Sequence, residues 1–149
     1  MKNSIKLIFS LGIVLSMMAC TSNDTSGPTG CDECVYTLAG NETSGTVPSS
    51  LNGTYNLTFS SSQPGSPYAD GTTAKFTIDN NELTVEIDGQ DCITLKNPVQ
   101  FSNTEVAFND SCTANVAYFI SASQNGTLNE INVMSDSSTP FTFYGQFAN

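Results

Sequence analysis

The chain has 149 residues, of which 14 are acidic and four are lysine or arginine, and its formal net charge is −10. Nucleic-acid binding is not expected, because neutralising phosphates takes several lysine or arginine side chains. The chain contains no histidine, which excludes catalytic triads, Cys-His pairs and imidazole metal ligands.

The first twenty residues have the order of a secretory signal. They begin with two lysines, continue with a largely apolar stretch over residues 5–15, and end in Ala19 and Cys20. This order predicts a cleaved signal peptide over residues 1–19, since the apolar stretch is shorter than the roughly 20 residues that span a bilayer. The end of the segment resembles the lipobox of bacterial lipoproteins, with Met17 in the place of the usual aliphatic residue.

The lipobox resemblance implies an anchor made of lipid. Cys20 would become the mature N-terminus and carry acyl chains such as palmitate, and two or more chains anchor a protein stably to a membrane. Residues 20–30 are polar and would form a flexible tether. A polar run after the cysteine, with Asp24 as its acidic residue, resembles the export signals of surface lipoproteins in Bacteroidota. We therefore expect a bacterial envelope protein at the outer membrane, on a face that the sequence leaves open.

The other four cysteines are expected to form two disulfides, because exported chains mature in an oxidising compartment. The preferred pairing joins Cys31 to Cys34 and Cys92 to Cys112. The alternative joins the N-terminal segment 31–50 to the rest of the domain by crossing pairs. The Cys31–Cys34 spacing also occurs in redox and zinc motifs, but a redox motif starts a helix and zinc needs further ligands at suitable spacing. Neither a metal nor a cofactor is expected.

From residue 51 onward, apolar side chains recur at every second position, as in half-buried strands. The clearest hairpin joins residues 74–78 to residues 83–87 through a tight turn. The polar loop 60–73 is expected to project from the domain. Strands are predicted over residues 51–59, 74–78, 83–87, 92–95, 105–108, 116–120, 130–134 and 141–147, with 99–101 continuing the fourth after a break.

These segments predict an all-β domain over residues 51–149 with about eight antiparallel strands. Short, regular connections favour an up-and-down barrel, and a β-sandwich is the alternative. The strand at 141–147 is expected to pair with the strand of Tyr55, because such an apolar edge would otherwise invite aggregation. Gly145 is expected to relieve crowding in that pair or to mark a bulge.

The run Gly53-Thr54-Tyr55 and the meander after it resemble the lipocalin-like small barrel domains of bacterial lipoproteins. The resemblance implies a barrel that is filled by its own side chains or holds one small ligand. Five aromatic residues are therefore candidate ligand contacts. The four that are expected to line the barrel interior are Tyr55, Tyr118, Phe141 and Phe143. The fifth, Tyr68, is expected to be exposed on the long loop.

No pattern in the sequence predicts catalysis. Asp70, Asp79 and Asp110 are ordinary turn residues and lack the converging oxygens of a calcium site. Glu82 and Glu86 share one hairpin and do not form the paired carboxylates of a glycosidase cleft. The sequence predicts a non-enzymatic binding or interaction module on a membrane-anchored lipoprotein, with an envelope protein as partner. The alternative is a carrier of a small apolar ligand inside the barrel.

Overall fold

The computed structural model describes residues 30–60, 62–136 and 141–149. The predicted signal peptide, the lipidation site Cys20 and the tether up to residue 29 lie outside these ranges. The described chain is all-β, as predicted, with one 3₁₀ turn at Ser49–Leu51. No helix in the described ranges has the length and hydropathy to cross a membrane.

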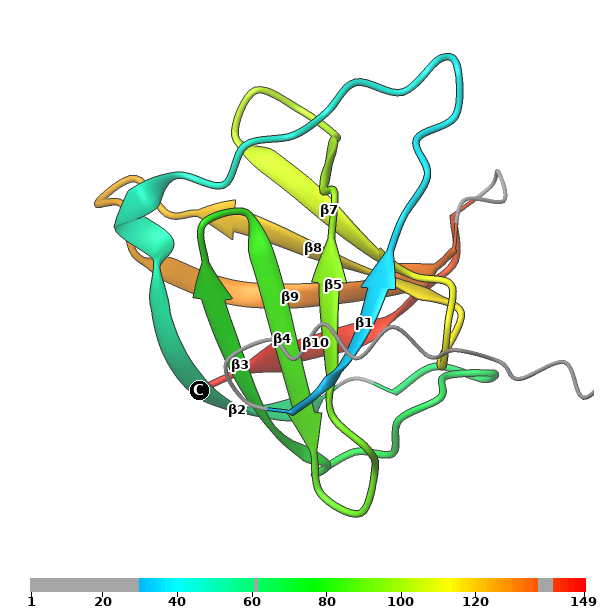
Figure 1. The fold of residues 1–149 in the computed structure, drawn as a ribbon. Coiled ribbons are helices and arrows are strands. Elements are labelled where there is room, and N and C mark those ends of the chain that lie inside the picture. The colour runs from blue at the N-terminus through cyan, green and yellow to red at the C-terminus, as the bar shows by residue number, and fades with distance from the viewer. Residues whose placement is uncertain (1–29, 61, 137–140) are drawn as a thin grey trace, which may run out of the picture.

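The described strands form a single curled sheet, in the order β1-β5-β4-β3-β2-β10-β9-β8-β7-β6, that makes a half-barrel (Figure 1). The sheet is mixed, because β1 runs parallel to β5 and the other pairs are antiparallel. A β-sandwich would have two separate sheets, so the single sheet does not support the sandwich alternative. The strands are β1 (Asp32–Val35), β2 (Gly53–Ser60), β3 (Thr73–Asp79), β4 (Glu82–Ile87), β5 (Ile93–Lys96), β6 (Val99–Gln100), β7 (Glu105–Asp110), β8 (Val116–Ala122), β9 (Leu128–Ser135) and β10 (Phe143–Ala148).

Two predicted pairings are confirmed. The hairpin of β3 and β4 turns at Asn80 and Asn81, which both have positive φ, the conformation that two-residue hairpin turns require. β10 pairs with β2, so that the ends of the meander meet. The sheet nevertheless stays open elsewhere, because the chain leaves β5 at Asn97, also at positive φ, and Pro98 follows. The two free edges of the sheet are β1 and β6.

The gap between these two edges, which we call the seam, is spanned by the N-terminal segment. Its first part is β1, which extends the sheet beyond β5. Its later part reaches the opposite edge, where Ser44 bridges Val99 and the Gly45 amide donates to the Pro98 carbonyl at 2.7 Å. A Cβ on Gly45 would lie 2.9 Å from a methyl of Val106, so this close approach requires glycine. The N-terminal segment therefore contributes β1 to one edge of the sheet and is hydrogen-bonded to the other edge at Ser44 and Gly45.

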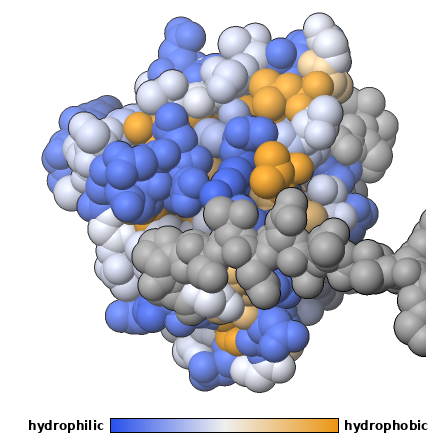
Figure 2. Space-filling model, viewed as in Figure 1, coloured by the Kyte–Doolittle hydropathy of each residue, from blue (hydrophilic) through white to orange (hydrophobic). Residues whose placement is uncertain are grey.

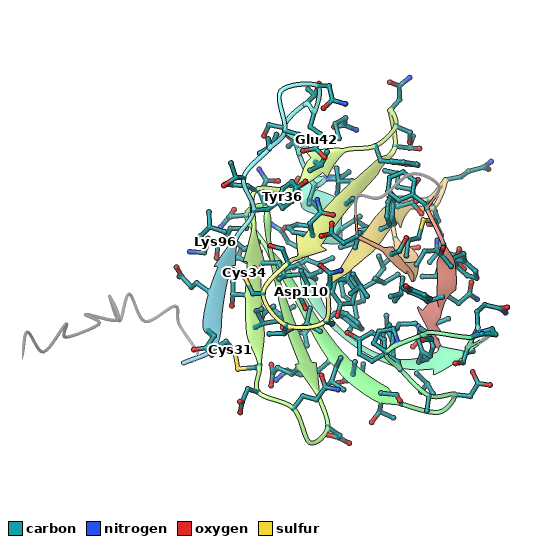
Figure 3. All side chains as sticks on the ribbon, turned by 90° about the vertical axis from the view of Figure 1, so that its right-hand side faces the viewer. Cys31, Cys34, Tyr36, Glu42, Lys96 and Asp110 are labelled. Atoms are coloured by element: carbon teal, nitrogen blue, oxygen red, sulfur yellow. A yellow bond between two sulfur atoms is a disulfide. The ribbon has the colours of Figure 1, made fainter. Side chains whose placement is uncertain are left out.

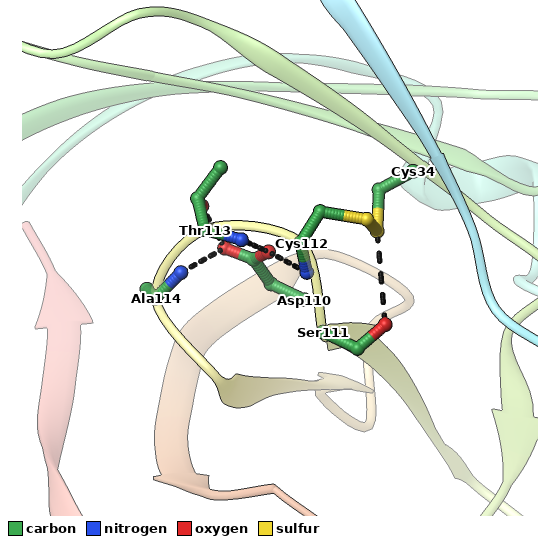
Figure 4. Close-up of a disulfide and its surroundings, with 6 residues drawn as sticks. All are labelled: Cys34, Asp110, Ser111, Cys112, Thr113 and Ala114. Atoms are coloured by element: carbon green, nitrogen blue, oxygen red, sulfur yellow. Dashed lines mark hydrogen bonds between the residues drawn. A yellow bond between two sulfur atoms is a disulfide. The ribbon is translucent and has the colours of Figure 1, made fainter.

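The disulfides join Cys31 to Cys92 and Cys34 to Cys112, and Figure 4 shows the second of them. The preferred pairing was wrong, and the crossing alternative is confirmed. Cys34 lies in β1 and Cys31 directly precedes it, and residues three apart in an extended strand are separated by about 10 Å, beyond the roughly 7 Å that a disulfide tolerates between Cα atoms. The Cys34–Cys112 bridge links β1 to the end of β7, and thus crosses the seam.

Asp110 fixes the loop that presents Cys112. Its side chain is only 1% exposed. The carboxylate accepts hydrogen bonds from the backbone amides of Cys112, Thr113 and Ala114 at 3.1, 2.8 and 3.1 Å, and from the Thr113 hydroxyl (Figure 4). Four donors compensate the burial of this charge. The sequence analysis placed Asp110 in a turn, whereas Asp110 is the last residue of β7 and its carboxylate caps the turn that follows. This turn holds one end of the disulfide across the seam.

The interior of the half-barrel is packed with aromatic rings. Phe59 and Phe147, which face each other across the β2–β10 pair, have ring centroids 4.9 Å apart. Tyr68 packs against both rings, at 5.6 and 5.4 Å, and is only 3% exposed. The prediction that Tyr68 is exposed was wrong, although most of the other described residues of loop 60–73 are exposed, as expected. Local polarity was a poor guide there, because the single large ring of the loop buries itself against the core.

Candidate binding groove on the outer face

Three of the five predicted ligand contacts have structural roles in this fold. The Tyr55 hydroxyl donates to the Leu51 carbonyl at 2.9 Å and its ring is half-buried against the core. Tyr68 and Tyr118 are buried, and their hydroxyls hydrogen-bond to each other. Burial raises the pKa of Tyr68 to about 12 and raises the pKa of Tyr118 well above its ordinary value. Both phenols therefore stay neutral at physiological pH.

Phe141 and Phe143 were predicted to line the interior, and this was wrong. They are 41% and 39% exposed on the outside of the sheet. The reason is a β-bulge in β10, where the register against β9 shifts between Phe143 and Gly145, so that an extra residue reverses the faces of the strand. Gly145 has a φ of 149°, and a Cβ there would lie 2.5 Å from the Phe59 ring. Both expected roles of this glycine, crowding and bulge, are confirmed.

The interior leaves little room for a ligand. The cavity bounded by Tyr68, Asp110 and Tyr118 has a volume of about 10 Å³. That is about the space of one water molecule, whereas small-molecule pockets usually measure a few hundred Å³ or more. The described interior therefore gives no support to the alternative of an apolar-ligand carrier.

A larger hollow of about 330 Å³ lies on the outer face of the sheet, and we call it the outer aromatic groove. It is bounded by β6, β7, β8 and the segments before β2 and β10. Its lining includes Glu42, Gln100, Phe101, Asn109, Phe119 and Phe141.

Three rings form the apolar part of the groove. Phe119 is 1% exposed and lies beneath, whereas Phe101 and Phe141 are 49% and 41% exposed. The centroid of Phe101 lies 4.7 Å from that of Phe119 and 5.9 Å from that of Phe141, and all three pairs meet edge to face. This packing holds the two outer rings in fixed positions while leaving part of each exposed to solvent.

Asn109 supplies the polar part of the groove floor. β7 alternates Val106 and Phe108 toward the interior with Ala107 and Asn109 toward the outside. The Asn109 side chain is only 6% exposed. Within the described part of the chain it has no hydrogen-bond partner. Asp136 Oδ1 is the buried side-chain polar atom without a partner in the described ranges, so the polar atoms of Asn109 reach solvent through the groove. The amide is therefore open to a hydrogen bond from a bound ligand.

Acidic and phenolic groups border the groove. The Tyr36 hydroxyl donates to Glu42 Oε1 at 3.2 Å, and the Ala39 amide donates to Glu42 Oε2 at 2.7 Å. Figure 3 shows Tyr36 and Glu42 together at one end of the molecule, beyond Cys34 in β1. Partial burial, then the carboxylates of Glu42 and Asp136, raise the pKa of Tyr36. These contacts hold the Glu42 carboxylate in place at the edge of the groove.

The two lysines of the described ranges lie elsewhere. Lys75 is 2.7 Å from Glu86, and Lys96 is 2.7 Å from Glu33 and 3.2 Å from Glu82. All of these residues belong to the strands of the opposite half of the sheet. The described lining of the groove therefore holds one carboxylate, Glu42, and no cation.

Other surface features are weaker candidates. Two hollows of about 670 and 330 Å³ lie along β2, β3 and β4 and are lined mostly by polar side chains, of which Lys75 and Glu86 already pair. The face in Figure 2 is mainly hydrophilic, with small separate apolar patches, and singly exposed apolar residues such as Val35 are normal on protein surfaces. No group of three or more acidic or cysteine side chains in the described ranges is placed to hold a metal ion.

Sequence reasoning missed Phe101, Asn109 and Phe119 as site residues. A signal for them was present in the sequence of β8, Val-Ala-Tyr-Phe-Ile, which is apolar at consecutive positions. A half-buried strand alternates, so an unbroken apolar run indicates that the outer face of β8 is also covered or used.

Comparison with models of known protein families, with curated proteins and with solved structures finds no match to this chain.

Proposed function

We propose that this protein is a lipid-anchored envelope lipoprotein whose β domain is a non-enzymatic binding module, with the outer aromatic groove as its binding site. The anchor is supported by the resemblance of residues 1–20 to lipoprotein signals. The antiparallel course from β2 to β10, with its closing pair, supports a lipocalin-like origin for the domain. In this proposal the meander has opened at the seam and moved its ligand site to the outside.

The observation that carries the proposal is the amide of Asn109, which lines the groove beside half-exposed rings and has no hydrogen-bond partner among the described residues. Binding pockets combine apolar walls with a few placed polar groups. The Asn109 amide is such a group, because its donors and its acceptor are not used by any described residue. A ligand in the groove would hydrogen-bond to Asn109 while its apolar part packs on the rings.

Two measurements test the anchor and the groove separately. For the anchor, Cys20→Ser should move the protein from the membrane fraction to the soluble fraction. For the groove, the full-length protein is purified in mild detergent from the bacterium that produces it and is analysed by native mass spectrometry. We expect a retained ligand or partner that is lost in Asn109→Ala and Phe141→Ala.

The matched control is Phe143→Ala, because Phe143 is nearly as exposed as Phe141 and does not line the groove. It should keep the retained mass. A wild-type protein that carries nothing, or a retained mass that all three variants keep, would contradict the assignment of the groove.

A further inference from the structure

We infer that the outer aromatic groove binds a neutral carbohydrate, through its exposed phenylalanine rings and the hydrogen-bonding side chains of Asn109 and Glu42. This inference rests on the proposed function, and it adds the chemical class of the ligand.

The rings suit one face of a sugar. A pyranose presents a patch of C–H groups on one side of its ring, and the faces of Phe101 and Phe141 carry the negative part of the aromatic quadrupole. The two rings are 5.9 Å apart at 85°, which offers two differently oriented surfaces within one hollow. Phe119 below them is fully buried and keeps the pair from collapsing into the sheet.

The polar groups suit hydroxyls. The Asn109 amide has two N–H donors and a carbonyl acceptor, and none of them is paired among the described residues. A sugar hydroxyl both donates and accepts, so neighbouring hydroxyls can satisfy both ends of the amide. Each Glu42 oxygen accepts one hydrogen bond already and has a lone pair left for a further hydroxyl donor.

Charge excludes the main competitors. Phosphates and acidic sugars would meet Glu42 at the groove edge and Asp136 near Tyr36, with no described lysine in the lining. An ammonium or guanidinium group could pair with Glu42, but it offers donors only and gives the N–H groups of Asn109 no acceptor. A folded protein partner needs about 800 Å² of surface on each side, which is far more than this hollow presents.

The test uses the full-length lipoprotein in detergent. It is first applied to an array of neutral oligosaccharides that covers gluco-, manno-, galacto- and xylo-oligosaccharides and chito-oligosaccharides. The strongest binder is then titrated by isothermal calorimetry. We expect binding of at least one neutral series, weakened about tenfold or more in Asn109→Ala and in Phe141→Ala, since that is the usual effect of losing one good contact. Phe143→Ala should bind within about twofold of wild type.

Salt separates the sugar from a cationic ligand. Binding of a neutral sugar should change by less than about twofold between 50 and 500 mM NaCl, whereas ion pairing at the groove edge would weaken strongly. The inference is overturned if the array stays empty, or if Asn109→Ala binds as well as wild type. If native mass spectrometry shows instead a protein partner that Phe141→Ala loses, the binding module stands and the carbohydrate assignment falls.

Discussion

Removing each disulfide in turn tests how the half-barrel is held closed. The two changes are the alanine pairs Cys31→Ala with Cys92→Ala and Cys34→Ala with Cys112→Ala. Taken alone, the bridges close loops with sequence separations of 61 and 78, and the chain-entropy model gives each about 4.3–4.5 kcal/mol. With the other bridge intact, the path between either pair runs through that bridge and covers only about 23 residues, so each removal should cost about 3.5 kcal/mol.

Because this unfolded-state cost is the same for both bridges, any difference between the two variants reports on the folded protein. Cys34 is fully buried, so truncation there leaves a cavity, and its bridge is the one that crosses the seam. We expect the Cys34–Cys112 variant to lose about 1 kcal/mol more than the Cys31–Cys92 variant. Urea unfolding gives the free energies, and hydrogen exchange should show faster opening of β1 and β6 in the Cys34–Cys112 variant alone.

Equal losses in the two variants, with unchanged exchange at β1 and β6, would show that the seam does not depend on its disulfide. Losses below about 1 kcal/mol in both would contradict the chain-entropy estimate itself.

Three further changes have definite expected outcomes. Gly145→Ala should lower the free energy of unfolding by about 2–4 kcal/mol in thermal unfolding, because its Cβ would collide with a buried ring and its φ of 149° disfavours alanine. The control is Gly40→Ala, which has open space around it and should change stability by less than about 1 kcal/mol. An equally small loss in Gly145→Ala would refute the bulge geometry. Asn109→Ala should change the free energy of unfolding in urea by less than about 1 kcal/mol. The neighbouring Asp110→Ala should lose about 3–4 kcal/mol, because it removes four hydrogen bonds. A large loss in Asn109→Ala would give Asn109 a structural role instead. Between pH 10 and 12, unfolded tyrosine ionises while the folded Tyr68, with its pKa raised to about 12, stays mostly neutral. The stability of the wild type, measured by urea unfolding at each pH, should therefore fall over this range, and that of Tyr68→Phe should fall by about 2 kcal/mol less. Parallel curves would refute this.

The predicted strands depend on local patterns, and those patterns held. The turn at Asn80 and Asn81 could be located because two-residue hairpins need positive φ and asparagine tolerates it. The pairing of β10 with β2 followed from the general need to cover an apolar edge. β1 was missed because Asp32–Val35 is too short to show alternation and has a single buried side chain, Cys34.

The candidate site could not be predicted for a different reason. One extra residue at the bulge before Gly145 decides whether Phe141 and Phe143 face the core or the solvent. The alternation of apolar residues in the sequence is the same with or without the bulge, so it does not reveal the reversal. Phe101, Phe119 and Asn109 come together only because β6, β7 and β8 are neighbours in the sheet. Phe101 and Phe119 are 18 positions apart in the chain, and no local sequence pattern predicts a contact over that separation.

The amino-acid sequence by itself determined the all-β class, most strand positions, the pairing of β2 with β10 and the exclusion of histidine chemistry. These depend on composition, on a period of two residues, on local turn preferences and on the need to cover an apolar edge. Only the tertiary structure decided the disulfide partners, the open seam, the burial of Tyr68 and the outward position of the groove. These depend on distances between residues far apart in the chain, and such distances are set by the curvature and register of the whole sheet.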